Sequence, residues 1–131
     1  MADHITTTRV RFGETDKMGI VYHANFIVYF ELGRTEYMRA KGLPYSECEK
    51  RGFRLVVVET GCRYKGSARY DEAITIRTRV TALGGATIRF EYDLDVDGRP
   101  IADGFTVLAS IDAEGKPVRT PQELRAILRP E

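Results

Sequence analysis

The sequence predicts an α+β protein in which a five-stranded antiparallel sheet wraps around one long helix. A stretch of about five helical turns lies between the first and the second of the strand-like segments. Short turn sequences join the later strands, so neighbouring strands are expected to run antiparallel. One long helix has a single large apolar surface to pack against, the inner face of the sheet, and the sheet therefore has to curve around it.

The first strand is predicted over residues 5–12, ITTTRVRF, because β-branched residues and alternation dominate there. Residues 23–42 then place apolar side chains at helical spacing. The stripe on one face of this helix consists of Phe26, Phe30, Gly33 and Tyr37, with Ile27 and Met38 beside it.

Both ends of the predicted helix carry boundary signals. Asn25 is the expected N-cap, and Gly42-Leu43-Pro44 is the expected stop. Gly33 inside the helix costs about 1 kcal/mol relative to alanine. A glycine at this position indicates that the helix backbone packs closely on a flat surface.

Four strands are expected after the helix, and the first of them is apolar on both faces from Leu55 to Val58. Gly84-Gly85 and Asp97-Gly98 are turn signals between later strands. Thr120-Pro121-Gln122-Glu123 has the pattern of a capping box and predicts a short C-terminal helix to about Leu128. The predicted strands are residues 53–65, 73–83, 86–96 and 101–112.

The length of 131 residues favours one domain, residues 1–131, that buries about two-thirds of its unfolded surface. Twenty Lys and Arg against nineteen Asp and Glu leave a net charge of +1, which argues against binding to nucleic acid or to an anionic membrane. The sequence has no apolar run of about 18 residues and no N-terminal signal peptide. We therefore expect a soluble cytoplasmic protein without a membrane span.

The two cysteines, Cys48 and Cys62, form no CxxC motif and accompany no pair of histidines. This spacing favours two reduced thiols over a disulfide or a zinc site. No metal site is expected.

The stretch RFGETDKMGIVYHANF places Asp16 near the end of the first strand and His23 near the start of the helix. An isolated Thr-Asp pair is usually a turn or the end of a strand. Here the pair belongs to a longer pattern: Arg9-Val10, four residues, Thr15-Asp16, two residues, Gly19-Ile20-Val21-Tyr22, two residues, Asn25-Phe26.

This pattern resembles the signature of the 4-hydroxybenzoyl-CoA thioesterase family. Three further segments resemble the acyl-CoA thioesterase branch associated with the Tol–Pal system, namely Tyr22-His23-Ala24, Tyr29-Phe30-Glu31 and Arg34-Thr35-Glu36. The resemblance implies the hotdog fold, in which a sheet wraps a central helix. It also implies hydrolysis of a short-chain or aromatic acyl-CoA to free acid and CoA.

The resemblance implies that Asp16 is the catalytic nucleophile or general base and that the backbone N–H of His23 polarises the thioester carbonyl. A helix N-terminus has unpaired N–H groups and about half a positive charge, which suits a developing oxyanion. Gly19 gives the loop freedom to fold Asp16 back towards the helix. Tyr22 is interpreted as a wall of the acyl pocket or as a chemical participant, and the His23 side chain as a capping or packing group.

Glu31 is expected to form a hydrogen bond or ion pair with Arg34 rather than to take part in catalysis. Between the second and third strands, Lys65, Ser67 and Arg69 surround Gly66 in the segment 63–72. These side chains are candidates for the phosphates of CoA. The alternative for this segment is a solvated turn with ordinary surface charges.

No cofactor is expected, because a thiolate is already a good leaving group and the CoA moiety belongs to the substrate. The resemblance implies a homodimer that joins two sheets edge to edge, and often a homotetramer. Two alternative functions remain. A hotdog dehydratase needs a histidine and a carboxylate paired across subunits, and the sequence has only His4 and His23. A non-catalytic acyl-CoA binding module would be expected to lack Asp16.

Overall fold

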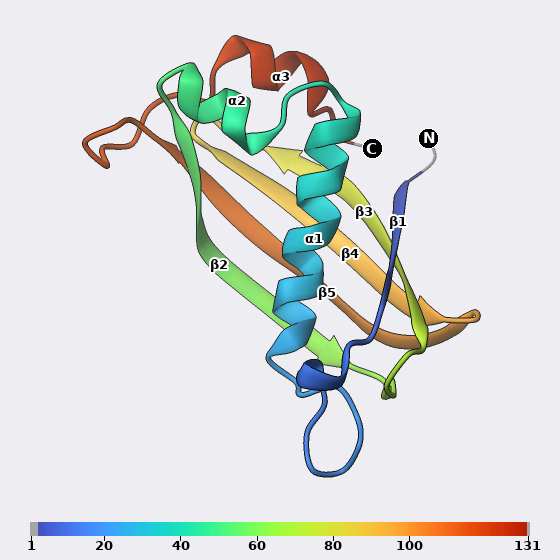
Figure 1. Ribbon diagram of the computed structural model, residues 1–131. Coiled ribbons are helices and arrows are strands. Elements are labelled where there is room, and N and C mark those ends of the chain that lie inside the picture. Colours follow the sequence, from blue (N-terminus) through green and yellow to red (C-terminus); the bar gives the residue numbers. More distant parts are fainter. Residues whose placement is uncertain (1–2, 131) are drawn as a thin grey trace.

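The structure, a computed structural model, describes residues 3–130. A five-stranded antiparallel sheet curves around helix α1 (Asn25–Ala40), as Figure 1 shows. The strand order is β1-β3-β4-β5-β2, which confirms the predicted fold class. The strands are β1 (His4–Arg9), β2 (Arg54–Tyr64), β3 (Ala73–Leu83), β4 (Thr87–Val96) and β5 (Arg99–Ile111).

Helix α1 packs on the concave face of the sheet through the predicted stripe. Phe30 is fully buried and stacks on Tyr92 of β4, with the ring centroids 4.5 Å apart and the planes 5° from parallel. A Cβ at Gly33 would lie 2.5 Å from Oγ1 of Thr78, so the glycine permits the close contact that the sequence indicated. Gly104 of β5 pairs with Tyr92, and a Cβ at Gly104 would meet the Phe30 ring at 2.6 Å and overlap the carbonyl oxygen of Gly61.

Two predicted helix caps are wrong. Helix α1 begins at Asn25 with Ala24 as N-cap, and the Asn25 amide instead donates a hydrogen bond to the carbonyl oxygen of Glu14 at 2.9 Å. Helix α3 (Gln122–Ile127) follows Pro121 without a side-chain cap. The hydroxyl of Thr120 lies 3.3 Å from Oγ of Ser110 in β5, because this buried position offers a polar partner from the sheet.

Two short elements were not predicted. A 3-10 turn, η1 (Phe12–Glu14), follows the first strand, which ends at Arg9 rather than at residue 12. Helix α2 (Tyr45–Lys50) covers the end of the sheet near α3, and Arg51 next to it pairs with Glu123 at 3.6 Å. Cys48 in α2 is a buried free thiol. Within residues 3–130, none of the helices has the length and apolarity needed to cross a membrane.

Strand β2 forms one edge of the sheet and pairs only with β5 among the described strands. The apolar residues Val56, Val57 and Val58 are exposed, with Val58 retaining 59% of its accessible surface. The pairing register shifts between Val57 and Glu59, which makes a bulge at Val58. Strand β2 is therefore apolar on both faces, as predicted, and much of it is uncovered in the structure.

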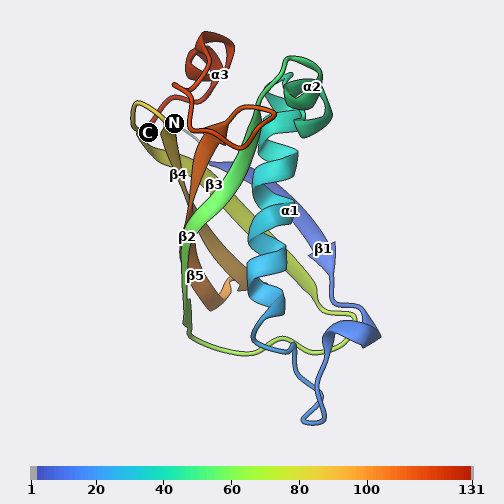
Figure 2. The same cartoon turned by 90° about the vertical axis from the view of Figure 1, so that its left-hand side faces the viewer.

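The connection from β2 to β3 crosses the sheet from one side to the other, because β3 lies between β1 and β4. Figure 2 shows this segment, residues 65–72, passing beneath the N-terminal end of α1. The N–H of Val21 donates to the carbonyl oxygen of Ala68 at 2.9 Å, and Ile20 forms a β-bridge with Arg69. The crossing segment therefore supports the loop that precedes α1.

Candidate active site

The loop that carries Asp16 is closed by backbone hydrogen bonds. The N–H of Asp16 donates to the carbonyl oxygen of Ile20 at 2.8 Å, and the N–H of Gly19 donates to the carbonyl oxygen of Asp16 at 2.9 Å. Gly19 has a φ of +79°, a conformation in which a side chain is strained. The Asp16 carboxylate accepts the N–H of Met18 through Oδ1 at 2.9 Å. The backbone of Asp16 is thus fixed at two points.

The start of α1 offers unpaired donors on the chain that follows this loop. The carbonyl oxygens of Tyr22, His23 and Ala24 accept the first N–H groups of the helix region. Within residues 3–130, the N–H groups of His23 and Ala24 themselves donate to no acceptor. Because α1 is a helix of sixteen residues, its N-terminal end also carries a partial positive charge. Two free donors at such an end can stabilise an oxyanion.

Aromatic side chains surround the start of α1. The hydroxyl of Tyr64, in β2, donates to the carbonyl oxygen of His23 at 3.1 Å, and its ring meets Phe26 edge to face at 5.3 Å. The Tyr22 ring lies 4.5 Å from the His23 ring. Tyr22 and Tyr64 are each about half exposed, at 49% and 50%. These rings form an apolar but open surface beside the free N–H groups.

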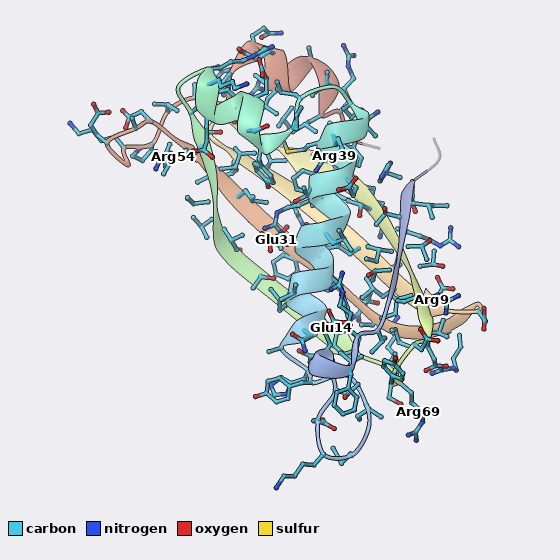
Figure 3. All side chains as sticks on the ribbon, in the orientation of Figure 1. Arg9, Glu14, Glu31, Arg39, Arg54 and Arg69 are labelled. Carbon is cyan, nitrogen blue, oxygen red and sulfur yellow. The ribbon has the colours of Figure 1, made fainter. Side chains whose placement is uncertain are left out.

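The three candidate phosphate ligands on the crossing segment, Lys65, Ser67 and Arg69, have different surroundings. The guanidinium of Arg69 lies next to the loop, since a Cβ at Gly19 would be 3.6 Å from its Nη1. Figure 3 shows Arg69 at the same end of the molecule as the start of α1. The Ser67 carbonyl oxygen accepts Nη1 of Arg99 at 2.8 Å, and its hydroxyl has no partner within residues 3–130.

The side chain of Lys65 forms an ion pair with Asp103 of β5. Its Nζ lies 2.6 Å from Oδ2 of Asp103, and Nε of Arg63 donates to Oδ1 of the same carboxylate at 2.9 Å. Hydrogen bonds from Arg63 and then Lys65 hold the pKa of Asp103 below its usual value. The structure thus places Arg69 beside Gly19 of the loop and binds the Lys65 ammonium to Asp103.

The expected pair between Glu31 and Arg34 is not formed in the structure. Arg34 is only 7% exposed, and its Nε donates to the hydroxyl of Tyr45 in α2 at 3.1 Å. Glu31 is exposed and has no ion-pair partner within residues 3–130. The helix therefore buries Arg34 against α2, which prevents the local pairing that the i, i+3 spacing suggested.

Sequence reasoning missed Glu14, although its contacts lie at the centre of the site. Its carboxylate accepts the hydroxyl of Tyr29 at 2.9 Å, and its carbonyl oxygen accepts the N–H of Tyr22 at 2.9 Å. No pattern in the sequence marks this contact, because Glu14 and Tyr29 are 15 residues apart and meet only in the fold. No group of three or more His, Cys, Asp or Glu side chains within residues 3–130 is arranged to hold a metal ion.

Residues 10–128 match the family model of the thioesterase-like superfamily, and the chain belongs to that superfamily. This membership confirms the predicted class, a hydrolase of thioesters with the hotdog fold.

Individual relatives agree with this class. The acyl-CoA thioesterase YbgC of Haemophilus influenzae is 32% identical over 90% of this chain and 88% of its own length. The crystal structure of a hypothetical protein from Aquifex aeolicus superposes with a TM-score of 0.93 at 33% identity, covering 96% of this chain and 99% of that one. The DHNA-CoA thioesterase of Staphylococcus aureus has a TM-score of 0.87 at 32% identity, covering 91% and 81% of the two chains.

Proposed function

We propose that the protein hydrolyses the thioester bond of a short-chain or aromatic acyl-CoA, giving the free acid and CoA. One observation carries the proposal: the closed loop that bears Asp16 leads into the start of α1, where the N–H groups of His23 and Ala24 have no partner within residues 3–130. A carboxylate and unpaired donors at one helix end are the groups that acyl transfer needs. Relatives named as acyl-CoA and DHNA-CoA thioesterases support the choice of substrate.

In the proposed reaction, the thioester oxygen binds at the N–H of His23. A carboxylate oxygen of Asp16 then attacks the carbonyl carbon, the carbon–sulfur bond breaks, and the CoA thiolate leaves. Water hydrolyses the resulting mixed anhydride and restores Asp16. In the alternative version Asp16 takes a proton from a water molecule, which attacks the carbonyl directly. Both versions use the same donors for the negative charge on the oxygen.

The surroundings of the helix start support a compact acyl group. Tyr22 and Tyr64, each about half exposed, offer aromatic surface beside the proposed oxyanion donors, and Phe26 packs beneath Tyr64. Aromatic groups pack on such surfaces edge to face or offset. Tyr22 is accordingly proposed as a wall of the acyl pocket, and Gly19 as the residue that lets the loop turn.

The proposed activity is tested by measuring thiol release from a panel of CoA esters, from short aliphatic to benzoyl and long-chain. A thioesterase releases one thiol for each acid formed. An acyl-CoA binding module would bind the esters without releasing thiol. A dehydratase would change the absorbance of a hydroxyacyl ester without freeing thiol, and either result would contradict the proposal.

Lys65, Ser67 and Arg69 are proposed to contact the phosphates of CoA. Replacing Lys65 and Arg69 together with alanine should raise KM for acyl-CoA and leave the hydrolysis of the matching pantetheine ester nearly unchanged. The reason is that exposed phosphate contacts bind substrate and transition state equally. Steady-state kinetics on the two esters measure this difference.

The single variants sharpen this test, because Lys65 is bound to Asp103 and Arg69 lies beside Gly19. Arg69→Ala alone is expected to carry most of the change in KM. Equal losses on the CoA and pantetheine esters would show that the two side chains serve the fold or the acyl pocket instead.

We further propose that the protein forms a homodimer through β2 and that dimers associate into a homotetramer. The exposed edge at Val56, Val57 and Val58 supports the first step, because an uncovered apolar strand edge readily pairs with another strand. Tyr22 and Tyr64 are half exposed in one protomer, so a neighbouring subunit could supply the missing walls of the acyl pocket.

Dilution should therefore lower specific activity in step with dissociation of the dimer, followed by light scattering. Val58→Glu should shift the equilibrium towards monomer, since two like charges would face each other at a paired edge. Val28→Glu is the matched control, because Val28 on α1 is similarly exposed at 52%. A monomer with full activity would contradict a site completed by two subunits.

A further inference from the structure

We propose that Glu14 is a positioning residue that fixes Asp16 relative to the start of α1, and that the buried hydroxyl of Tyr29 holds Glu14 in place. The inference rests on the proposed function, since it concerns the geometry of the same reaction. Glu14 itself is not proposed to touch the substrate.

The carboxylate of Glu14 is held by three hydrogen bonds. Its Oε1 accepts the hydroxyl of Tyr29 and the backbone N–H of Arg11, each at 2.9 Å. Its Oε2 accepts Nη1 of Arg11, also at 2.9 Å. The Glu14 side chain is only 16% exposed, and its bond to Tyr29 is partly buried, whereas the Arg11 side chain is 74% exposed. A carboxylate with this many partners has a single well-defined position.

The main chain of Glu14 is held from the same helix. Its carbonyl oxygen accepts Nδ2 of Asn25 at 2.9 Å and the N–H of Tyr22 at 2.9 Å. Asn25 and Tyr29 are four residues apart in α1 and therefore project from the same face. Residues in the first two turns of α1 thus bind both the carboxylate and the main-chain carbonyl oxygen of Glu14. Figure 3 shows Glu14 beside this part of α1.

These contacts connect the two groups that the proposed reaction brings together. Asp16 follows Glu14 by two residues, and Thr15 between them is tied to the carbonyl oxygen of Phe12 by its hydroxyl at 2.7 Å. On the other side, the N–H that binds Glu14 belongs to Tyr22, which directly precedes His23. Glu14 is therefore the point at which the loop carrying Asp16 and the start of α1 are joined.

Burial keeps the Tyr29 hydroxyl protonated, so that it continues to donate to Glu14. Tyr29 is 2% exposed, and this burial, followed by the hydrogen bond to Glu14, raises its pKa well above the usual range. The hydroxyl consequently remains a donor throughout the pH range in which thioesters are assayed. Arg11 supplies the positive charge beside the partly buried carboxylate.

The test begins with Tyr29→Phe, which removes one hydroxyl and keeps the ring. We expect kcat to fall about tenfold while KM stays within about twofold, because misplacement of a reacting group affects the chemical step. Tyr92→Phe is the matched control, since it removes another buried tyrosine hydroxyl, which lies 2.6 Å from Oγ1 of Thr106. The control is expected to lose similar thermal stability and to keep its kcat.

The conservative variant separates positioning from simple loss of structure. Glu14→Gln keeps an acceptor for Tyr29 and the main-chain carbonyl, so it should stay within about threefold of the wild-type kcat. Glu14→Ala removes the acceptor and should lose tenfold or more. Equal losses in the Gln and Ala variants would contradict the role of the Tyr29 contact.

A second measurement does not depend on activity. Amide hydrogen exchange of Tyr22, followed by NMR, should be about tenfold faster in Tyr29→Phe than in the wild type, because its acceptor on Glu14 is less well fixed. It should be unchanged in Tyr92→Phe.

The two hypotheses fail in different ways. Unchanged exchange and unchanged kcat in Tyr29→Phe would overturn the positioning role and leave the proposed thioesterase activity intact. A wild-type protein that releases no thiol from any ester would overturn the proposed function, and with it the catalytic meaning of the Glu14 contacts.

Discussion

Replacing Asp16 with asparagine is expected to lower kcat by at least about 100-fold. Asparagine keeps the size of the side chain and an oxygen that can accept the N–H of Met18, so the loop should remain closed. It cannot attack a carbonyl carbon as a carboxylate does, nor take a proton from water. Because the donors at His23 and Ala24 remain, KM should change little. Stopped assays of thiol release on the purified variant measure both constants.

His23→Ala tests a separate claim about the same junction. Its backbone N–H survives the change, so the loss in kcat should be much smaller than for Asp16→Asn. An Asp16→Asn protein that is folded and within threefold of the wild-type kcat would leave Asp16 as a turn residue. A His23→Ala protein as inactive as Asp16→Asn would show that the imidazole, rather than the backbone, is the second catalytic group.

Gly104→Ala is expected to destabilise the protein by about 3 kcal/mol, at the upper end of the usual cost of overpacking a core. The added methyl group would overlap the carbonyl oxygen of Gly61 and press on the Phe30 ring at 2.6 Å. A backbone oxygen in a paired strand cannot move aside as the end of a flexible side chain can. The melting temperature should fall by about 10 °C in a calorimetric scan.

Gly13→Ala is the control for this substitution. Gly13 lies in η1, and a Cβ there would meet no atom within 4 Å. Its melting temperature should stay close to that of the wild type. If Gly104→Ala unfolded at the same temperature as Gly13→Ala, the close approach of Phe30 to the sheet would be wrong.

The strands were predictable where one face is buried and the other is not. Strand β3 was predicted with its observed bounds, because its inward positions, such as Ile74 and Ile76, alternate with polar ones. The position of β2 in the sheet was not predictable in this way. Its apolar residues fit a central strand as well as an uncovered edge, and only pairing with β5 distinguishes the two.

The helix ends were less predictable than the helices. Asn25 and Thr120 have side chains that commonly cap helices, yet each finds a partner distant in sequence, Glu14 and Ser110. Tertiary contacts of this kind override a local preference. Helix α2 was not predicted, because six residues are too few to show a clear helical repeat of apolar positions.

In the candidate site, too, residues within one sequence segment were predictable and contacts between distant segments were not. Asp16 and His23 were predicted together because they lie in one short segment with a family pattern, and their catalytic roles stay a prediction. The contact of Tyr29 with Glu14 and that of Val21 with Ala68 leave no periodic mark in the sequence. They follow from where α1 and the crossing segment lie relative to the loop, and therefore only from the fold.

The crossing of residues 65–72 beneath α1 also has a consequence for the order of folding. Strands β3, β4 and β5 are joined by tight turns and can pair at a small cost in loop entropy. Strand β2 must instead bring Arg54 to Ile111, and β1 must bring His4 to Thr78, before the segment between β2 and β3 can reach Val21. We therefore expect the three-stranded meander to form early and the loop around Asp16 to take its shape last. A chain caught part-way through folding would have most of its sheet and no completed site.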